Sequence, residues 1–246
     1  MKQLFVLFAV LLMVCSCSDE ILNEDNHQAI LGASNVTFSF DSITEPSNWR
    51  KYQSLEEMLA ACQIPEGKLK SMSTDELIEV CMSHPLCGIY SAYNNEMEGV
   101  KVIVNNFNGF VELRKRKDAS TDLLHFYEAV LFNPQYKSES HVNYTDPAHI
   151  GFIELYIASR DIKDIYDEPN ISELERISNS VLDFKLLDKE VPLSSIRHTL
   201  LINAQVKLEQ NRLQPDDLNI LRQFVNSSGS TRNPKDYTTI SKILSE

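Results

Sequence analysis

Residues 54–62 read Ser-Leu-Glu-Glu-Met-Leu-Ala-Ala-Cys, and residues 73–81 read Ser-Thr-Asp-Glu-Leu-Ile-Glu-Val-Cys. In each stretch a serine precedes a glutamate by three positions, which is the capping box that satisfies free amides at a helix start. A proline follows each stretch, Pro65 and Pro85, and ends one helix while suiting the first turn of the next. We therefore predict two similar short helices, each with a buried cysteine. Two copies suggest a repeat architecture but fall below the three that a stacked array needs.

Capping residues and apolar positions three and four apart continue to the C-terminus. Asp146 followed by Pro147 is a strong helix start, and isoleucines from Ile150 through Ile162 and Ile165 predict a long helix packed on two sides. Other helices are predicted at residues 98–107, 109–117, from 120 onward, 172–189 with Phe184 on its buried stripe, 194–211, 216–226 and 237–244. Strand-like alternation is limited to residues 36–40. We expect an all-α protein of about nine or ten helices, arranged as an irregular bundle or a curved stack of helix pairs.

The N-terminus has the pattern of an export signal. A short cationic start, Met1-Lys2-Gln3, precedes an apolar run at residues 4–14 that is too short to cross a bilayer, which takes about 20 residues. The next residues, Val14-Cys15-Ser16-Cys17, resemble a bacterial lipobox, with an aliphatic residue three positions before the lipidated cysteine and a small residue directly before it. This pattern selects Cys17 as the lipid anchor over Cys15. Residues 1–16 are then a signal peptide.

Residues 17–50 are predicted to be a flexible, lipidated tether. Its acidic start, Ser18-Asp19-Glu20, is similar to the export tag of Bacteroidetes surface lipoproteins, and it also fits a plain solvated linker, because acidic segments with few aromatic residues stay disordered. Residues 51–246 are expected to form the helical domain, with a subdivision near 133–146 as an option.

A family resemblance covers residues 50–130 best, together with the lipobox. The matching stretches are residues 54–59, 63–65, 72–77, 92–95, 107–110 and 112–113. They resemble a family of uncharacterised helical lipoproteins from gut Bacteroidetes. The resemblance implies a lipid-anchored helical protein and no particular activity.

Charge and glycine content exclude several function classes. The chain has 23 basic and 35 acidic residues, a net charge of −12, which opposes binding to nucleic acid or to anionic bilayers. Its seven glycines form no phosphate-binding or dinucleotide-binding pattern. We therefore expect no cofactor and no nucleic-acid partner.

Cysteines and histidines leave alternatives open. Cys62, Cys81 and Cys87 can form one disulfide and a free thiol, in three pairings, or they can be buried and reduced; their spacing does not suit a structural zinc site. His141 and His149, with Asp146 between them, can form a metal site, or Asp146 can simply cap a helix. The remaining candidates, His84, His125 and His198, are expected to be structural.

Two further features have a structural and a functional interpretation. The basic run at residues 114–117 can dock an anionic glycan or the lipid surface, but cations also stabilise helix C-termini with their charged groups in water. The aromatic residues Tyr90, Tyr93, Phe107 and Phe110 can form a platform for sugar rings, but such residues in helices usually belong to the core.

Motifs of the common hydrolases are missing from the sequence. We therefore expect a lipid-anchored protein of the cell envelope, held at the outer membrane and either periplasmic or exposed on the cell surface. Its helical domain is expected to bind a protein, peptide or glycan without catalysing a reaction. The alternatives are a surface hydrolase acting on peptides or glycans and a structural subunit of an envelope assembly.

Overall fold

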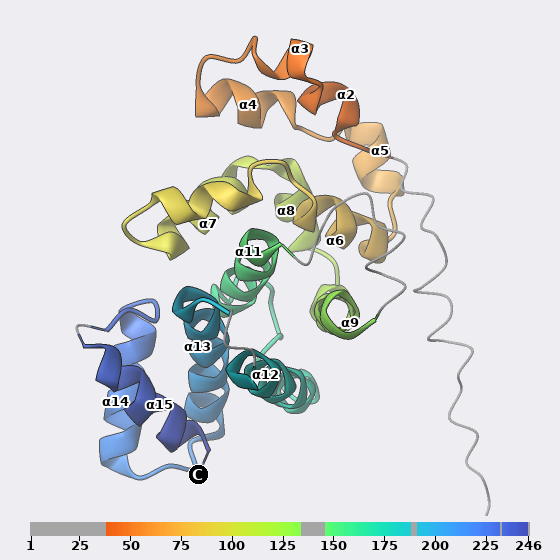
Figure 1. Cartoon of the computed structure of the whole chain (residues 1–246). Coiled ribbons are helices and arrows are strands. Elements are labelled where there is room, and N and C mark those ends of the chain that lie inside the picture. The colour runs from red at the N-terminus through yellow and green to blue at the C-terminus, as the bar shows by residue number, and fades with distance from the viewer. Residues whose placement is uncertain (1–37, 134–145, 188–190, 232, 246) are drawn as a thin grey trace, which may run out of the picture. The chain divides into compact units, whose positions relative to one another are not determined.

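The computed structural model describes residues 38–133, 146–187, 191–231 and 233–245 (Figure 1). This part of the chain contains fourteen helices and no strand, which confirms the all-α prediction. In chain order the helices are α2 (Asp41–Thr44), α3 (Pro46–Trp49), α4 (Leu55–Ala61), α5 (Glu66–Ser71), α6 (Thr74–Met82), the 3-10 helix η1 (Cys87–Ala92), α7 (Glu96–Asn106), α8 (Asn108–Leu113), α9 (Ala119–Phe132), α11 (Pro147–Ala158), α12 (Asn170–Leu187), α13 (Leu193–Gln210), α14 (Pro215–Asn226) and α15 (Pro234–Leu244).

The predicted helix starts are confirmed where a polar side chain caps them. The amide of Glu76 donates to Ser73 Oγ over 3.2 Å, and the Glu76 carboxylate accepts from the Ser73 amide over 3.1 Å, so the capping box of α6 is complete. At the start of α4 the Glu57 amide donates to Ser54 Oγ, but the Glu57 carboxylate accepts from the Gln53 amide, so this box is only half formed. The Asp146 side chain accepts from the Ala148 amide at the start of α11. Local sequence therefore determines where these helices begin.

Several predicted boundaries differ from the structure. Helix α11 ends at Ala158 because Arg160 adopts a left-handed backbone with φ of 59°, so Ile162 and Ile165 are buried in the following loop and not on the helix. Helix α8 ends at Leu113, four residues earlier than predicted. Two short helices, α2 and α3, lie within residues 17–50, the range assigned to the tether, and residues 38–40 are not a strand. With α5 and η1, these short helices raise the count above the predicted nine or ten.

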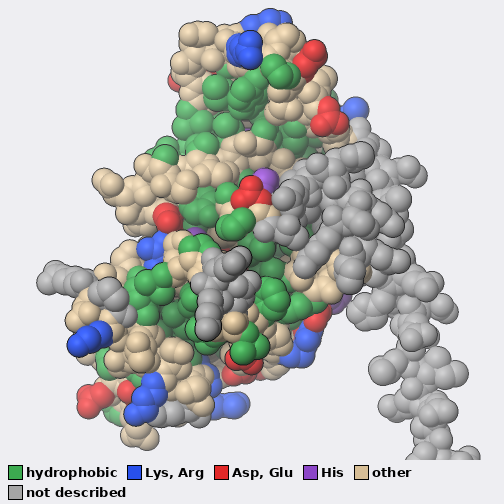
Figure 2. Space-filling view, in the orientation of Figure 1, with side chains coloured by type: hydrophobic (Ala, Val, Ile, Leu, Met, Phe, Trp, Pro, Cys, Tyr) green, Lys and Arg blue, Asp and Glu red, His purple; other side chains and the backbone are tan. Residues whose placement is uncertain are grey.

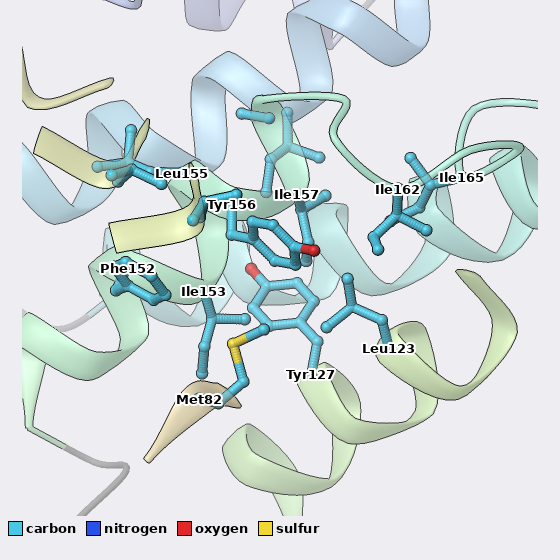
Figure 3. Packing of buried hydrophobic residues seen from close by; sticks show 14 of the residues in the cluster. Met82, Leu123, Tyr127, Phe152, Ile153, Leu155, Tyr156, Ile157, Ile162 and Ile165 are labelled. Carbon is cyan, nitrogen blue, oxygen red and sulfur yellow. The ribbon is translucent and has the colours of Figure 1, made fainter. Parts of the chain in front are cut away.

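Helix α11 lies at the centre of the described domain. Every residue from Gly151 to Ala158 is buried, which confirms packing on both sides. Its neighbours are α6, α7, η1 and α13, so it joins helices from distant parts of the sequence. Tyr156 of α11 lies beside Tyr127 of α9 in Figure 3, and both belong to one buried cluster with Met82, Leu123 and Phe152. Since repeats in a stacked array contact mainly their sequence neighbours, this arrangement is that of an irregular bundle.

Four helices of the bundle form two parallel pairs that run in opposite directions. Glu128 of α9 pairs with Arg176 of α12, and Thr121 with Asn170, so α9 and α12 are parallel. Helix α12 is antiparallel to α13, since the Lys185 ammonium donates to the Ser195 carbonyl near one end and Lys207 pairs with Glu175 near the other. Helices α11 and α13 are parallel, as shown by the bonds Thr199–Glu154 and Gln205–Ala158. The last turns of α9 and α12 and the first turns of α11 and α13 therefore lie at one end of the bundle.

Residues 35–246 form one compact unit. Helix α9, which precedes residues 134–145 in the chain, packs against α12, which follows them. Across the described residues, no helix combines the length and the apolar character that a bilayer span requires.

Candidate functional site

A buried ion pair lies where α9, α11, α12 and α13 meet. The Lys185 ammonium donates to both carboxylate oxygens of Glu154 over 2.7 Å, and the side chains are 4 % and 0 % exposed. The hydroxyls of Tyr127 and Thr199 donate to the same carboxylate over 2.7 and 2.8 Å. Burial and the adjacent Glu154 charge raise the pKa of Tyr127 well above its ordinary value, so this tyrosine stays a donor. These groups satisfy one another and hold the four helices together.

A second polar cluster joins the start of α7 to α13. His198 Nε2 lies 2.7 Å from Glu96 Oε2, and Arg197 pairs with the same carboxylate. Burial favours the neutral acid, but the bonds from His198 and Arg197 outweigh it and lower the pKa of Glu96. The His198 side chain is only 4 % exposed, so it has little contact with solvent. The pair resembles an acid–base pair in geometry, but its histidine is enclosed.

A polar pocket opens at the end of the bundle where α11 finishes. Its volume is about 150 Å³, and we define it by the lining residues Val100, Lys101, Val104 and Asn105 of α7 with Ser159 and Asp161 after α11. The two valines form an apolar base, because α7 presents them to the core at helical spacing. The pocket therefore combines an apolar contact with a cation, a carboxylate, an amide and a hydroxyl.

Arg114 holds one wall of the polar pocket in place. Its Nε donates to Asp161 Oδ2 over 2.6 Å, while its Nη2 donates to the Val104 carbonyl and to Asn105 Oδ1 over 3.0 and 3.1 Å. The guanidinium therefore fixes α7 against the residues that follow α11. The Asp161 carboxylate also interacts with the Tyr156 side chain. The Lys101 side chain is 53 % exposed and pairs with Glu98 over 2.9 Å, which leaves further ammonium hydrogens that can donate to a ligand.

An apolar surface lies at the opposite end of the bundle. We call it the apolar end and define it by Phe132, Phe184, Leu186, Leu187 and Leu193, whose exposed fractions are 43 %, 54 %, 52 %, 84 % and 50 %. Figure 2 shows hydrophobic side chains gathered over α12 and α13 on the face presented. Phe184 was predicted to lie on the buried stripe of α12, but it is more than half exposed. The reason is that Lys185 occupies the inward position at this turn, so both of its neighbours face outward.

The sequence-predicted cysteines and histidines have structural positions. Cys62, Cys81 and Cys87 are free and buried, and burial raises the pKa of Cys62 to about 11. His84 is fully buried against Phe107, and burial lowers its pKa to about 3. His198 is also buried, but it pairs with Glu96, a partner that helical spacing could not reveal.

Asp146 caps α11, as one of the two interpretations predicted, and it partly counteracts the burial that lowers the pKa of His149. His141 and the predicted anchor Cys17 lie outside the described residues. No group of three or more histidine, cysteine or acidic side chains suited to a metal occurs among the residues that are described.

The basic run and the aromatic residues serve the fold. Helix α8 ends before this run, and Arg114 and Arg116 donate instead to carbonyls near the ends of neighbouring helices, Val104 of α7 and Leu69 of α5. Their charged groups are only about a quarter exposed and are not in open water. Tyr90, Phe107 and Phe110 are buried, and Tyr93 is partly buried, which agrees with a role in the core.

Sequence reasoning missed the residues that form these sites. Lys101, Asn105, Ser159 and Asp161 come from two distant segments, and their types are common on helix surfaces. Glu154 carried a usable signal, because it is the one charged residue in the apolar run at 150–158. Such a residue in a two-sided helix requires a buried partner.

No protein-family model matches the chain, and no curated protein or solved structure was found to match it. The family resemblance of residues 50–130 therefore stays a prediction.

Proposed function

We propose that this chain is a lipid-anchored protein of the cell envelope whose helical domain binds a peptide or glycan partner without catalysis. The lipobox supports the anchor at Cys17. The polar pocket is the observation that carries the binding role. It offers hydrogen-bond donors, acceptors and an apolar base, contributed by α7 and by the residues that follow α11.

The size of the polar pocket supports a partner larger than a metabolite. Sites that enclose a small molecule usually measure about 300–1,000 Å³. A volume of about 150 Å³ holds one side chain, a chain end or part of one sugar ring. The remainder of the partner must then lie over neighbouring helices, as is usual for proteins that bind chains.

The alternative of a surface hydrolase depends on an acid–base pair that reaches a substrate. The Glu96–His198 pair has the right separation, but the histidine is enclosed. Arg114, in turn, occupies one oxygen of Asp161, which leaves less of that carboxylate free for proton transfer. A binding role therefore fits these groups better than proton transfer does.

The test is binding of the purified chain to peptide and glycan libraries, followed by affinity measurements on two variants. Lys101→Ala is expected to lower the affinity by about tenfold, because it removes a charged hydrogen bond to the ligand. Lys70→Ala is the matched control, since Lys70 is also exposed and pairs with a glutamate on its own helix, α5. Equal affinities for both variants, or turnover of any ligand in the library, would contradict the proposal.

Anchoring is tested separately. The wild-type chain is expected to incorporate a labelled fatty acid and to sediment with membranes, and Cys17→Ala is expected to do neither. A lipid label that persists in Cys17→Ala would show that the anchor has been assigned to the wrong residue.

A further inference from the structure

The apolar end consists of exposed leucine and phenylalanine side chains from three neighbouring helix ends, those of α9, α12 and α13. Phe132 is the last residue of α9, while Phe184, Leu186 and Leu187 form the last turn of α12. Leu193 begins α13, and the bond from Lys185 to the Ser195 carbonyl holds this start against the end of α12. Five large apolar side chains therefore project from one end of the bundle, opposite the polar pocket.

The chemistry of these side chains favours hydrocarbon over a protein partner. Protein-binding hot spots are rich in tryptophan, tyrosine and arginine, whereas leucine is under-represented. Leucine and phenylalanine are typical of apolar faces that enter the boundary between lipid headgroups and acyl chains. Leu187, at 84 % exposure, stands out from the surface. A fluid acyl layer accepts such a projection without a shaped pocket.

The chain length between the proposed anchor and the domain permits contact with the same bilayer. Residues 17–38 can span at most about 70 Å when fully extended, so an anchor at Cys17 keeps the domain within reach of the membrane. The net charge of −12 opposes attraction to anionic headgroups, so burial of apolar side chains must supply the contact.

We propose that the apolar end inserts into the headgroup–acyl boundary of the bilayer that holds the lipidated Cys17. This inference rests on the proposed anchoring and adds an orientation to it. With the apolar end in the bilayer, the polar pocket at the opposite end points away from the membrane toward its ligand.

The test uses the full chain, processed in a lipoprotein-exporting bacterium and reconstituted into phosphatidylethanolamine–phosphatidylcholine vesicles. A fluorophore is attached to Leu187→Cys or, as a matched control, to Ile220→Cys on α14, since Ile220 is also an exposed apolar residue, at 36 %. Cys62, Cys81 and Cys87 are at most 1 % exposed and do not compete for the label. Bromine atoms placed on the acyl chains just below the headgroups then quench a fluorophore that enters the boundary, which lies about 5–10 Å deep.

We expect at least roughly threefold stronger quenching at Leu187→Cys than at Ile220→Cys, because only the first site enters the boundary. Equal quenching in protein that floats with the vesicles would overturn the insertion and leave the anchor intact. Protein that does not float and whose mass shows no lipid would overturn both. A Leu187→Cys fluorophore shielded from iodide but not quenched by bromine would show that a second copy covers the surface, which also overturns the inference.

Discussion

Removing the ammonium of Lys185 is expected to destabilise the protein strongly. The Lys185→Met variant keeps most of the side-chain volume but leaves the Glu154 carboxylate, which is 0 % exposed, without its cation. Of the groups that the structure describes, only the hydroxyls of Tyr127 and Thr199 still donate to it, and the Ser195 carbonyl loses a donor. Breaking one side of a buried ion pair costs about 3–5 kcal/mol, because the remaining charge is uncompensated.

The expected loss in stability is large enough to measure in two ways. Urea unfolding followed by circular dichroism gives the free energy of unfolding directly. In thermal unfolding of a chain of this size, each kcal/mol of lost stability lowers Tm by about 2–4 °C, so the same loss should lower Tm by roughly 6–20 °C. Lys70→Met is the control, because Lys70 pairs with Glu66 in the open, at 70 % and 79 % exposure, and such pairs contribute about 0–1 kcal/mol.

A double variant separates lost charge pairing from lost packing. Replacing both groups, as Lys185→Met with Glu154→Gln, removes the uncompensated charge while the amide can still accept from Tyr127 and Thr199. We expect it to recover at least about half of the loss. A Lys185→Met variant within about 1 kcal/mol of wild type, or a double variant no better than the sum of the single changes, would refute the interpretation of a buried, charged pair.

Three other predictions concern separate parts of the domain. Gly151→Ala is expected to cost about 1–3 kcal/mol in urea unfolding, since its Cβ would clash with Tyr90 Oη, and Tyr90→Phe in the same chain should relieve most of that cost. Asp122→Asn is expected to raise stability at neutral pH, because burial, followed by repulsion from Asp75 and Asp118, raises the Asp122 pKa to about 6 from 3.8. All three buried cysteines, Cys62, Cys81 and Cys87, should resist alkylation in the folded protein and react on unfolding, as mass spectrometry of the treated protein will show.

Each of these predictions has a control or a contrary result. Gly67→Ala is the control for Gly151→Ala, because its Cβ would have no neighbour within 4 Å, and it should not destabilise. For Asp122, the folded state binds the proton more tightly than the unfolded state, so its penalty is present above about pH 6 and is lost as the pH falls toward 3.8. A stability gain in Asp122→Asn that persists below that value would contradict the pKa argument. Alkylation of a cysteine in the folded protein at neutral pH would contradict the burial argument.

Local signals in the sequence predicted the helices well. Ser54, Ser73 and Asp146 cap helices as expected, because capping depends only on residues within one turn. The predicted end of α11 was wrong, because Arg160 adopts a left-handed backbone conformation that an arginine in the sequence does not indicate. The helices α2 and α3 were missed because each has four residues, too few for a periodic pattern.

The candidate sites were far less predictable from the sequence than the helices were. Glu96 and His198 are 102 residues apart, and Arg114 and Asp161 are 47 apart, so only the packed fold brings them together. Phe184 was misplaced because its spacing fits the apolar stripe while Lys185, a residue type that is usually exposed, takes the buried position. Long-range polar partners therefore overrode the local pattern.

The central position of α11 also determines when the domain can become stable during synthesis. Phe110 and Tyr127 precede residue 133, yet their partners Tyr156 and Glu154 are translated later. A ribosome-bound chain that stops at residue 133 therefore has no closed core. We expect such nascent chains to be readily digested by protease until residues 147–206 have emerged, which would keep the chain unfolded long enough for the export that the proposed lipid anchor requires.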